Sequence, residues 1–436
     1  MSFPTYKQYK ESGFQWLGVV PDTWEVNISR RYFYEIREPR KSEDVQLSAT
    51  QKIGVVPQTM FMEMEDQKVV LALKGLSNFK HVEPDDFVIS LRSFQGGIER
   101  SKYQGCVSPA YTVLRQKKLI DPNFISYVFK STGYIDALQS VTDGIREGKN
   151  IKYDQFANLG LVLPSVYEQK KIVTFLDHET AKIDTLVVEQ EKLIGLLKEK
   201  RQAVISHAVT KGVEPSVKKK NSGVEWLGEV PEHWKILKIK RLSAVQRGAS
   251  PRPIDDPKYF DAEGEYGWVR ISDVSSSNGV LRNTEQKLSV LGSSLSVKIE
   301  PKQLFISIAG TVGKPCISGI KACIHDGFVY FPTLQINPWW LFRIFEAGVC
   351  YGGLGKLGTQ LNLNTDTVGS ISIGVPPTEE IESILSFIKI TLEKFDGLIF
   401  EAHKVINLSL ERRSSLISAA VTGKIDVRNY QPKDAE

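Results

Sequence analysis

Three short motifs contain residue types that could perform chemistry, and each lacks the pattern that the chemistry needs. The run NPWW at Asn337 lacks the second proline of the Asn-Pro-Pro-Tyr loop of amino-methyltransferases, and no glycine-rich cofactor loop follows an early strand. GTVGK at Gly310 has neither the spacing nor the Ser or Thr of a phosphate loop. In a nuclease-like motif at Asp85, Glu99 and Lys102 stand one residue too far apart. The sequence therefore predicts no catalytic residue.

The residue types that most often bind metals are not arranged for it either. The four cysteines form no C-x-x-C pair and have no neighbouring histidine at metal-ligand spacing: Cys106, Cys316, Cys323 and Cys350. We expect them to be reduced thiols. The sequence thus predicts no metal and no cofactor in this chain, and no enzyme in its own right.

Glycine-hinged loops in two parts of the chain carry Arg, Lys, Asn and Gln instead. Arg and Lys suit phosphates and guanine edges, Asn and Gln suit adenine, and glycine lets the backbone come close. For any single residue, a solvated surface charge is an equally good interpretation. The loops are therefore a stronger prediction than their members. The candidate DNA-binding residues are Arg92, Gln95, Arg100, Lys102, Arg146, Lys149, Asn150, Lys152, Arg247, Arg252, Arg270, Lys314, Lys356, Thr359, Gln360 and Asn362.

Bulk composition is that of an ordinary soluble protein. The chain has 436 residues, of which 41% are hydrophobic and 25% are charged, enough length for about two or three domains with real cores. A net charge of +5 permits a nucleic-acid partner without demanding one. No apolar signal segment opens the chain, and no run approaches the ~18 apolar residues of a membrane helix. We expect a cytoplasmic protein.

The element that must position the loops is a long helix predicted at 163–212. Ser165 and Glu168 form a capping box at its start, and Gly212 ends it. From Ile172 onward a stripe recurs at alternating steps of four and three, which is typical of a heptad seam between paired helices. At about 1.5 Å per residue, roughly 45 residues span about 65 Å, too long for one compact domain. We therefore interpret the helix as a spacer.

A second copy of this helix ends the chain, shifted by 212 residues. Both stripes are interrupted at matching heights, for example at Lys200 and Arg412, which suggests two helices specified for each other. The predicted helix–helix seam consists of Ile172, Leu176, Ile183, Leu186, Leu193, Leu197, Val204, Ile384, Ile388, Phe395, Leu398, Val405 and Leu416.

The stretch that opens the chain is repeated as well. SGFQWLGVVPDTWEV at 12–26 returns as SGVEWLGEVPEHWKI at 222–236, so that each copy has two tryptophans. These aromatic residues either pack the edge of the domain that follows or dock against the far end of the helical rod. The sequence leaves both interpretations open.

A globular segment lies between opener and helix in each copy. PDDFVISLRSFQGG at Pro84 aligns with PKQLFISIAGTVGK at Pro301, and Asp121 and Asn337 each cap a short helix that begins with proline. Mixed strands and short helices predict an α+β fold class. The predicted division is a first globular domain at 1–162, a first long helix at 163–212, a linker and second globular domain at 213–373, and a second long helix with a tail at 374–436.

This order of domain, helix, domain, helix suggests an internal pseudo-twofold repeat. If such an axis relates the halves, the two helices run antiparallel as a coiled-coil spacer and the globular segments lie at opposite ends. One chain would then imitate a symmetric dimer. Dimeric DNA readers use that geometry to meet two half-sites on one face of a duplex.

Over its whole length the chain resembles the specificity subunits of type I restriction-modification systems. The resemblance rests on the openers KESGFQWLGVVPDTWEV and NSGVEWLGEVPEHWKI, and on LPSVYEQKKIVTFLDHETAKIDTLVVEQEKLIGLLKEKRQAVISHAVTKG with its copy. These follow the family's order of target-recognition domain, conserved helix, target-recognition domain, conserved helix. Inside the recognition domains the likeness is weak, so no base-reading residue can be carried over.

The resemblance implies a non-catalytic subunit that reads a bipartite sequence in double-stranded DNA, with the helices setting the gap. It also implies assembly with two methyltransferase subunits and two translocase/nuclease subunits, on which S-adenosylmethionine, ATP and Mg would be found. Because the openers and the long helices repeat while the recognition domains differ, we expect an asymmetric target. Three alternatives stay open: the specificity subunit of a stand-alone methyltransferase without nuclease, a self-contained DNA-modifying enzyme, and a coiled-coil adaptor without DNA contact.

Overall fold

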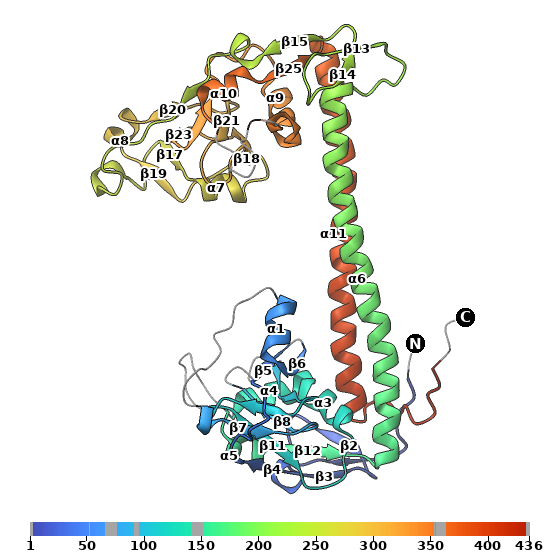
Figure 1. The fold of residues 1–436 in the computed structure, drawn as a ribbon. Helices are drawn as coiled ribbons and strands as arrows, with labels where there is room; N and C mark the ends of the chain where they lie inside the picture. The colour runs from blue at the N-terminus through green and yellow to red at the C-terminus, as the bar shows by residue number, and fades with distance from the viewer. Residues whose placement is uncertain are drawn as a thin grey trace. The chain divides into compact units, whose positions relative to one another are not determined.

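The structure is a computed structural model and describes residues 3–51, 53–65, 76–90, 96–141, 151–352, 354 and 363–432. The chain forms two compact units, one of residues 1–190 with 403–436 and one of residues 191–402. Two long helices, α6 (Val166–Lys211) and α11 (Thr378–Val421), contribute to both units and lie side by side in each (Figure 1). The first part of α6 meets the last part of α11 in one unit and the reverse holds in the other, so the helices run antiparallel.

Both units contain a frame of antiparallel strand pairs built from the repeated openers. In the first unit the pairs are β1 (Tyr9–Glu11) with β2 (Val19–Pro21), and β3 (Glu25–Ile28) with β12 (Gly160–Leu163). In the second they are β13 (Lys219–Asn221) with β14 (Glu229–Pro231), and β15 (Lys235–Lys238) with β25 (Ser372–Val375). A 3-10 turn follows each frame, η1 (Ser29–Arg31) and η3 (Ile239–Arg241). Each frame joins an opener to the strand that leads into a long helix.

The rest of the first unit is built around one four-stranded antiparallel sheet. Its order is β4 (Phe33–Ile36), β11 (Thr112–Gln116), β8 (Phe87–Ile89) and β9 (Glu99–Arg100). Two further strand pairs are β5 (Leu47–Thr50) with β6 (Gly54–Pro57), and β7 (Lys80–Val82) with β10 (Gly105–Val107). The short helices are α1 (Gln58–Glu65), η2 (Leu76–Asn78), α3 (Pro122–Lys130), α4 (Thr132–Ser140) and α5 (Tyr153–Ala157).

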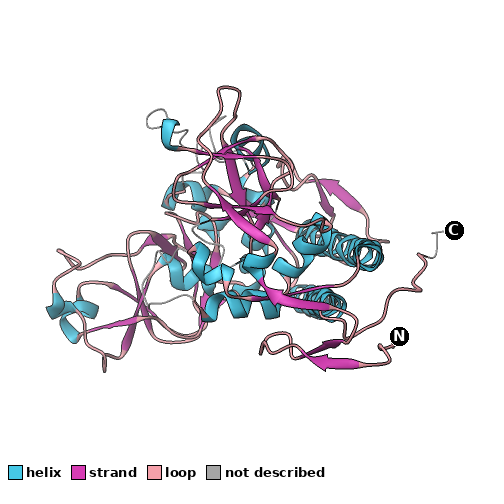
Figure 2. Ribbon diagram, turned by 90° about the horizontal axis from the view of Figure 1, so that it is seen from below, coloured by secondary structure: helices cyan, strands magenta, loops and turns pink. Residues whose placement is uncertain are grey.

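The second unit has two sheets, of five and four strands, in the corresponding place. One runs β16 (Gln246–Arg247), β24 (Phe328–Tyr330), β21 (Leu304–Ser307), β22 (Pro315–Ser318) and β18 (Val280–Leu281). The other runs β19 (Gln286–Leu288), β17 (Tyr266–Val269), β23 (Ala322–Ile324) and β20 (Val297–Ile299). The short helices are η4 (Pro257–Tyr259), α7 (Ile271–Ser276), α8 (Val290–Ser294), α9 (Pro338–Ala347), η5 (Val349–Tyr351) and α10 (Thr365–Ser370). Strands and short helices mix throughout (Figure 2), which confirms the predicted mixed class.

The two short helices predicted from their caps form in equivalent places. At α3 the Asp121 carboxylate accepts hydrogen bonds from two backbone N–H groups, and at α9 the Asn337 side chain accepts one. Proline occupies the first turn of both helices. The two aligned strand motifs also match, because Asp85 and Lys302, each just before its strand, both have a left-handed backbone with φ of 72° and 74°.

Half of the predicted capping box forms at the start of α6. The Ser165 hydroxyl accepts a hydrogen bond from the backbone N–H of Glu168 at 3.3 Å. The Glu168 carboxylate accepts a hydrogen bond from the hydroxyl of Tyr6 at 2.7 Å instead of reaching back to the backbone. A residue of the opener thus helps to fix the start of the long helix.

The two tryptophans of the first opener have different partners, so each of the two interpretations describes one of them. Trp16 packs within the globular part, where its Nε1 donates to the backbone oxygen of Gly160 at 3.1 Å. Trp24 is fully buried and lies against Gly423, just past the end of α11. The hydroxyl of Tyr9 donates to the backbone oxygen of Gly423 at 3.1 Å. The opener of the first copy therefore docks on the helix of the second.

The glycines at the two helix ends predict different responses to substitution. Gly423 and Gly212 both have positive φ, but a Cβ at Gly423 would lie 2.3 Å from Cδ of Pro21, whereas at Gly212 the nearest atom, in Trp234, is 3.5 Å away. We expect Gly423→Ala to lower the free energy of unfolding by about 2–4 kcal/mol and Gly212→Ala by about 1–2 kcal/mol. Chemical denaturation of both variants measures this, and equal losses would contradict the packing difference.

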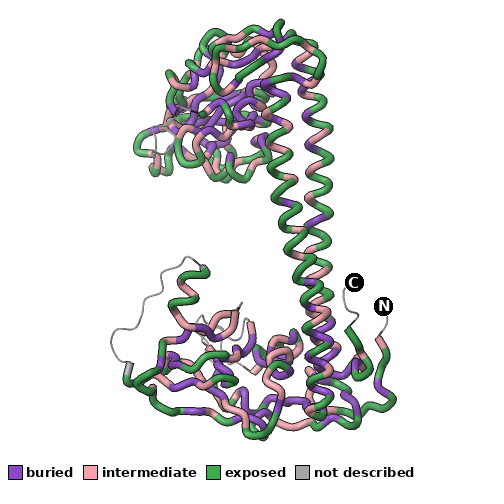
Figure 3. Tube along the Cα trace, turned by 45° about the vertical axis from the view of Figure 1, so that its right-hand side comes forward, coloured by how far each residue is buried: buried purple, intermediate pink, exposed green. Residues whose placement is uncertain are grey.

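The long helices correct the predicted seam at one position in each heptad. Of the predicted residues, Ile172, Leu176, Ile183, Ile384, Ile388 and Leu416 are buried, and Leu197, Val204 and Phe395 are partly buried. The remaining four are exposed: Leu186, Leu193, Leu398 and Val405. Figure 3 shows buried positions recurring at intervals along both helices. Each long helix has an apolar stripe, as predicted, but alternate positions of the stripe differ from the predicted ones.

The positions that replace the four exposed residues lie one residue later. They are Val187, Ile194, Ile399 and Ile406, which are buried or partly buried. Apolar residues occupy both adjacent positions at most of these sites, so steps of three then four and of four then three fit the sequence equally well. The same shift occurs in both copies, as expected for two helices that are packed equivalently.

Matching ion pairs cross the helix pair in the two units. In the first unit Nε of Arg413 donates to Oδ1 of Asp184 at 2.9 Å. In the second unit Nε of Arg201 lies 3.5 Å from Oδ1 of Asp396. Both the arginines and the aspartates are 212 residues apart. The polar interruption of the seam is therefore at Arg201 and Arg413 rather than one residue earlier, and each helix supplies the same two groups, as twofold-related antiparallel helices do.

Candidate nucleic-acid interface

Seven of the sixteen candidate DNA-binding residues fall in the part of the chain that the structure describes. They are Arg100, Lys102, Lys152, Arg247, Arg252, Arg270 and Lys314. The other nine lie outside the described residues: Arg92, Gln95, Arg146, Lys149, Asn150, Lys356, Thr359, Gln360 and Asn362. These residues are distributed over both units, and five of the seven lie in three places.

The first place is a cavity of about 590 Å³ in the first unit, lined by residues of β9, α3, α6 and α11. Arg100 is fixed at its rim, because its Nε donates to Oδ1 of Asp85 at 2.8 Å and its Nη1 donates to Oδ1 of Asn123 at 2.6 Å. Lys102 lines the same cavity and is exposed. Arg100 is thus a partly neutralised, oriented group, and Lys102 presents its charge to solvent.

A carboxylate inside this cavity modifies its charge. Burial raises the pKa of Glu99 to about 7, although the ammonium of Lys130 beside it opposes the shift. Lys130 also donates to the backbone oxygen of Gly96 at 2.8 Å. Near neutral pH the Glu99 carboxyl is therefore divided between its neutral and charged forms, and the local charge around Lys130 depends on pH.

The second place is an equivalent cavity of about 940 Å³ in the second unit. Lys314 lies in its wall, where its Nζ donates to the backbone oxygen of Ser275 at 2.7 Å. Arg201 enters it from α6 as Arg413 enters the first cavity from α11, and α9 takes the place of α3. The two cavities share their location within the repeat, while the side chains that line them differ.

The third place is an arginine pair at the carboxyl end of β23. Nε of Arg247 donates to the backbone oxygen of Asp326 at 2.5 Å, and Nη2 of Arg252 donates to the Asp326 carboxylate at 3.0 Å. The side chain of Arg252 is still 73% exposed. Burial lowers the pKa of the neighbouring His325, whose Nδ1 accepts the backbone N–H of Gly327. Asp326 therefore orients two guanidinium groups toward solvent, which suits phosphate or guanine contacts.

Lys152 and Arg270 stand apart from these three places. The backbone N–H of Lys152 donates to the side chain of Gln155 at the start of α5, and its own side chain is exposed. Nη1 of Arg270 donates to Glu285 at 3.0 Å, and its Nη2 donates to Gln286. Arg270 is thus engaged within its own domain, in contrast to the exposed Arg252.

Sequence reasoning missed Asp326 as the residue that orients the arginine pair, and it missed Arg201 and Arg413 as cavity residues. Asp326 is far from Arg247 in the sequence, so no local pattern signals their contact. Arg201 and Arg413 could have been found from their offset of 212 residues, because the same offset relates Asp184 and Asp396.

Comparison with known proteins identifies the family. No protein-family model matches the chain. The type I restriction enzyme MjaVIII specificity subunit of Methanocaldococcus jannaschii is 23% identical, over 97% of this chain and 98% of the relative. The chain belongs to the type I restriction-modification specificity subunits. The StySPI specificity subunit of Salmonella potsdam is 28% identical to this type I specificity subunit, over 33% of the chain and 32% of the relative.

Solved structures agree on the fold of this specificity subunit. A chain from a structure concerned with complex assembly and conformational transition of the type I R-M system aligns with a TM-score of 0.71 and 13% identity, covering 92% of this chain and 98% of that one. The HsdS subunit of Thermoanaerobacter tengcongensis aligns with a TM-score of 0.56 and 13% identity, covering 93% and 98%. Both share the mixed α/β domains and paired long helices.

Membership of this family excludes one alternative considered from the sequence. Specificity subunits are the non-catalytic members of type I complexes, so the subunit is not a self-contained DNA-modifying enzyme. In the part of the chain that the structure describes, no helix combines the length and the apolar content that crossing a membrane requires.

Proposed function

We propose that this specificity subunit reads a bipartite, asymmetric sequence in double-stranded DNA and directs adenine methylation or cleavage by partner subunits. Residues 1–162 and 213–373 act as the two target-recognition domains, and the long helices at 163–212 and 374–436 set the gap between the two parts of the target. The partners are two methyltransferase subunits and two translocase/nuclease subunits, which carry S-adenosylmethionine, ATP and Mg. The complex works in the cytoplasm.

The observation that carries this proposal is a repeated frame that holds two different recognition surfaces. The openers, the strand pairs that follow them and the helix ion pairs recur in both units. The sheets between them do not, because among the described residues the first unit has a four-stranded sheet and two strand pairs where the second has sheets of five and four strands. Equivalent frames favour two equivalent encounters with DNA, and different sheets favour a different sequence at each.

The charged groups support contact with a nucleic acid. Arg252 and Lys102 are exposed cations, one in each recognition domain, and Arg252 is held in place by Asp326. Cations that neutralise phosphates make affinity fall as salt rises. A coiled-coil adaptor without DNA contact predicts no such dependence, so the salt titration separates the two functions.

Methylation mapping tests the proposal most directly. A host genome is sequenced with and without this gene, in the presence of the neighbouring methyltransferase gene in both strains. We expect methyladenine at one gapped, asymmetric motif only when the gene is present. Methylation at a palindromic motif would contradict the asymmetric target. Methylation without any cleavage of unmodified DNA would favour the stand-alone methyltransferase that lacks a nuclease.

A further inference from the structure

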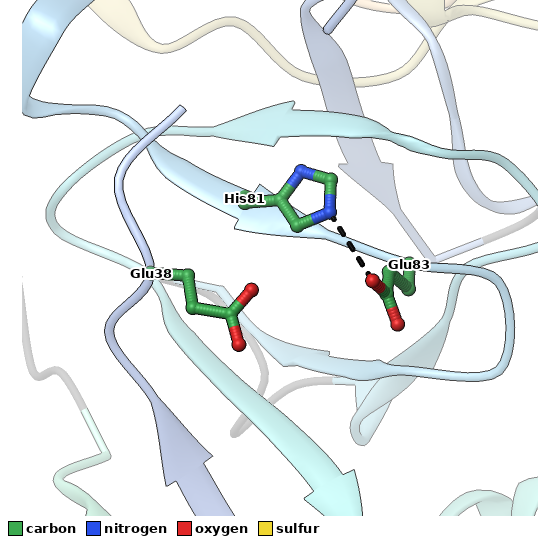
Figure 4. Close-up of side chains that lie close together, drawn as sticks. All are labelled: Glu38, His81 and Glu83. Carbon is green, nitrogen blue, oxygen red and sulfur yellow. Dashed lines mark ion pairs between the residues drawn. The ribbon is translucent and has the colours of Figure 1, made fainter. Parts of the chain in front are cut away.

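A group of four side chains in the first unit has the composition of a metal centre. Glu38, His81 and Glu83 each offer a ligand atom, and these atoms all lie within 4.8 Å of one another (Figure 4). Asp44 lies behind the histidine. Glu38 follows β4, whereas His81 and Glu83 belong to or follow β7, so the fold brings together residues that are far apart in the sequence.

The position of His81 is set before any ligand arrives. Its side chain and that of Asp44 are both fully buried, and its Nδ1 lies 2.8 Å from Oδ2 of Asp44. The backbone also holds it, because the N–H of His81 donates to the backbone oxygen of Glu38 at 2.8 Å. A carboxylate that accepts at Nδ1 places the proton of a neutral imidazole there, so Nε2 keeps its lone pair.

That Nε2 atom is buried and makes no hydrogen bond. It points toward Glu83, whose Oε1 is 3.5 Å away (Figure 4). A lone pair and a carboxylate that face each other repel unless a cation lies between them. In protein metal sites, a carboxylate commonly accepts the second ring N–H of a metal-bound imidazole and so fixes its orientation. Asp44 is placed to do this for His81.

The cations near this group make their closest contacts elsewhere or at longer distances. Arg115 is held by Asp86 through two hydrogen bonds of 2.8 and 2.7 Å, and its contacts with Glu38 and Glu83 are longer, at 3.4 Å each. Lys41 approaches Glu83 at 3.5 Å from the surface. The side chains of Glu38 and Glu83 are 45% and 43% exposed, so both are free to turn toward a bound ion.

We propose that Glu38, His81 and Glu83 bind a first-row divalent cation, with Asp44 as the residue that orients the imidazole. One nitrogen and two carboxylate ligands match Zn²⁺, which binds such groups at about 2.0–2.2 Å. Such an ion ties the segment after β4 to β7 within the first recognition domain. No sequence pattern signals this site, because Glu38 and His81 lie far apart in the chain.

Zinc binding to the purified, tag-free full chain tests the site without DNA or partners. We expect one tightly bound equivalent by equilibrium dialysis with elemental analysis, and a higher unfolding midpoint with zinc than after chelation. Glu38→Gln and Glu83→Gln, both at exposed side chains, are expected to weaken zinc binding by about tenfold or more, and Asp44→Asn by about 10–100-fold. The shift in the midpoint should shrink in parallel.

The matched control is His233→Gln in the second unit. His233 also has a carboxylate partner, with its Nε2 2.6 Å from Oε2 of Glu380, but it lies outside the cluster. This variant should bind zinc as the unaltered chain does. The proposal is overturned if the unaltered chain shows no saturable zinc binding, or if both glutamine variants retain full affinity. Either result would leave His81 as a buried histidine that is paired with Asp44 and has no ligand role.

Discussion

Ile183→Asp is expected to lower the free energy of unfolding by roughly 3–5 kcal/mol, because it places a charge in a buried seam. Ile183 is 7% exposed and belongs to the core of the first unit, where the two long helices pack together. The seam cation Arg413 is already paired with Asp184. Thermal unfolding of the full chain, followed by circular dichroism, measures the loss, and under the proposed function assembly with the methyltransferase is also abolished.

Leu186→Asp is the matched control for that substitution. Leu186 stands three residues further along the same helix and was predicted to share the seam, but it is 37% exposed. The same charge placed there should change the free energy of unfolding by no more than about 0.5 kcal/mol. If the two variants were equally destabilised, the register of the helix pair would be the predicted one rather than the observed one.

The duplication of the chain could be predicted because residues that are close together in the sequence form the repeated patterns. Asp121 and Asn337 each precede a proline, and a capping side chain acts within three residues of itself, so both short helices appear where expected. The two openers share Ser-Gly, Trp-Leu-Gly, Val-Pro and a second Trp at equal spacing. Interactions that span a few residues leave a readable pattern, and the mixed fold with two long helices follows from them.

The register of the long helices could not be predicted because it depends on the partner helix. Leu193 and Ile194 are adjacent and both apolar, and either could face inward. In the structure Ile194 is 6% exposed and Leu193 is 42% exposed. The apolar residues of one helix define a stripe about two positions wide. The packing of α11 against α6 determines which of the two positions faces inward. Arg201 and Arg413, which form the ion pairs between the helices, likewise lie one residue after the predicted positions.

The candidate sites escaped prediction for a related reason. The carboxylate of Asp326 meets Arg252 from 74 residues away, and His81 meets Asp44 from 37 residues away. Spacing rules describe ligands on one helix or one loop, whereas these contacts are made where strands from different parts of the chain end together. The residue types were visible in the sequence, but their proximity is a property of the sheets.

Arg247, Arg252 and Asp326 form a group at the carboxyl end of β23, the Asp326 cluster, and removing its two guanidinium groups tests the second recognition domain. Arg247→Ala with Arg252→Ala is expected to weaken binding of a duplex carrying the mapped motif by about 10–100-fold, because two oriented cations are lost. It should also make the slope of log affinity against log salt shallower by about 2, since each phosphate contact contributes about 0.9. A fluorescence anisotropy titration at several salt concentrations, with the methyltransferase partner present, gives both quantities.

Charge alone is controlled by a second double variant in the same domain. Lys298 and Lys321 are exposed, and their Nζ atoms lie 4.7 and 5.9 Å from the centroid of the Tyr266 ring, beside the amino end of β23, whereas Asp326 follows that strand. Lys298→Ala with Lys321→Ala removes the same number of positive charges from the opposite end of that strand. If only the arginine variant changes the salt slope, the DNA meets the carboxyl end of β23. If both variants change it equally, the effect is that of net charge, and the Asp326 cluster is not part of the interface.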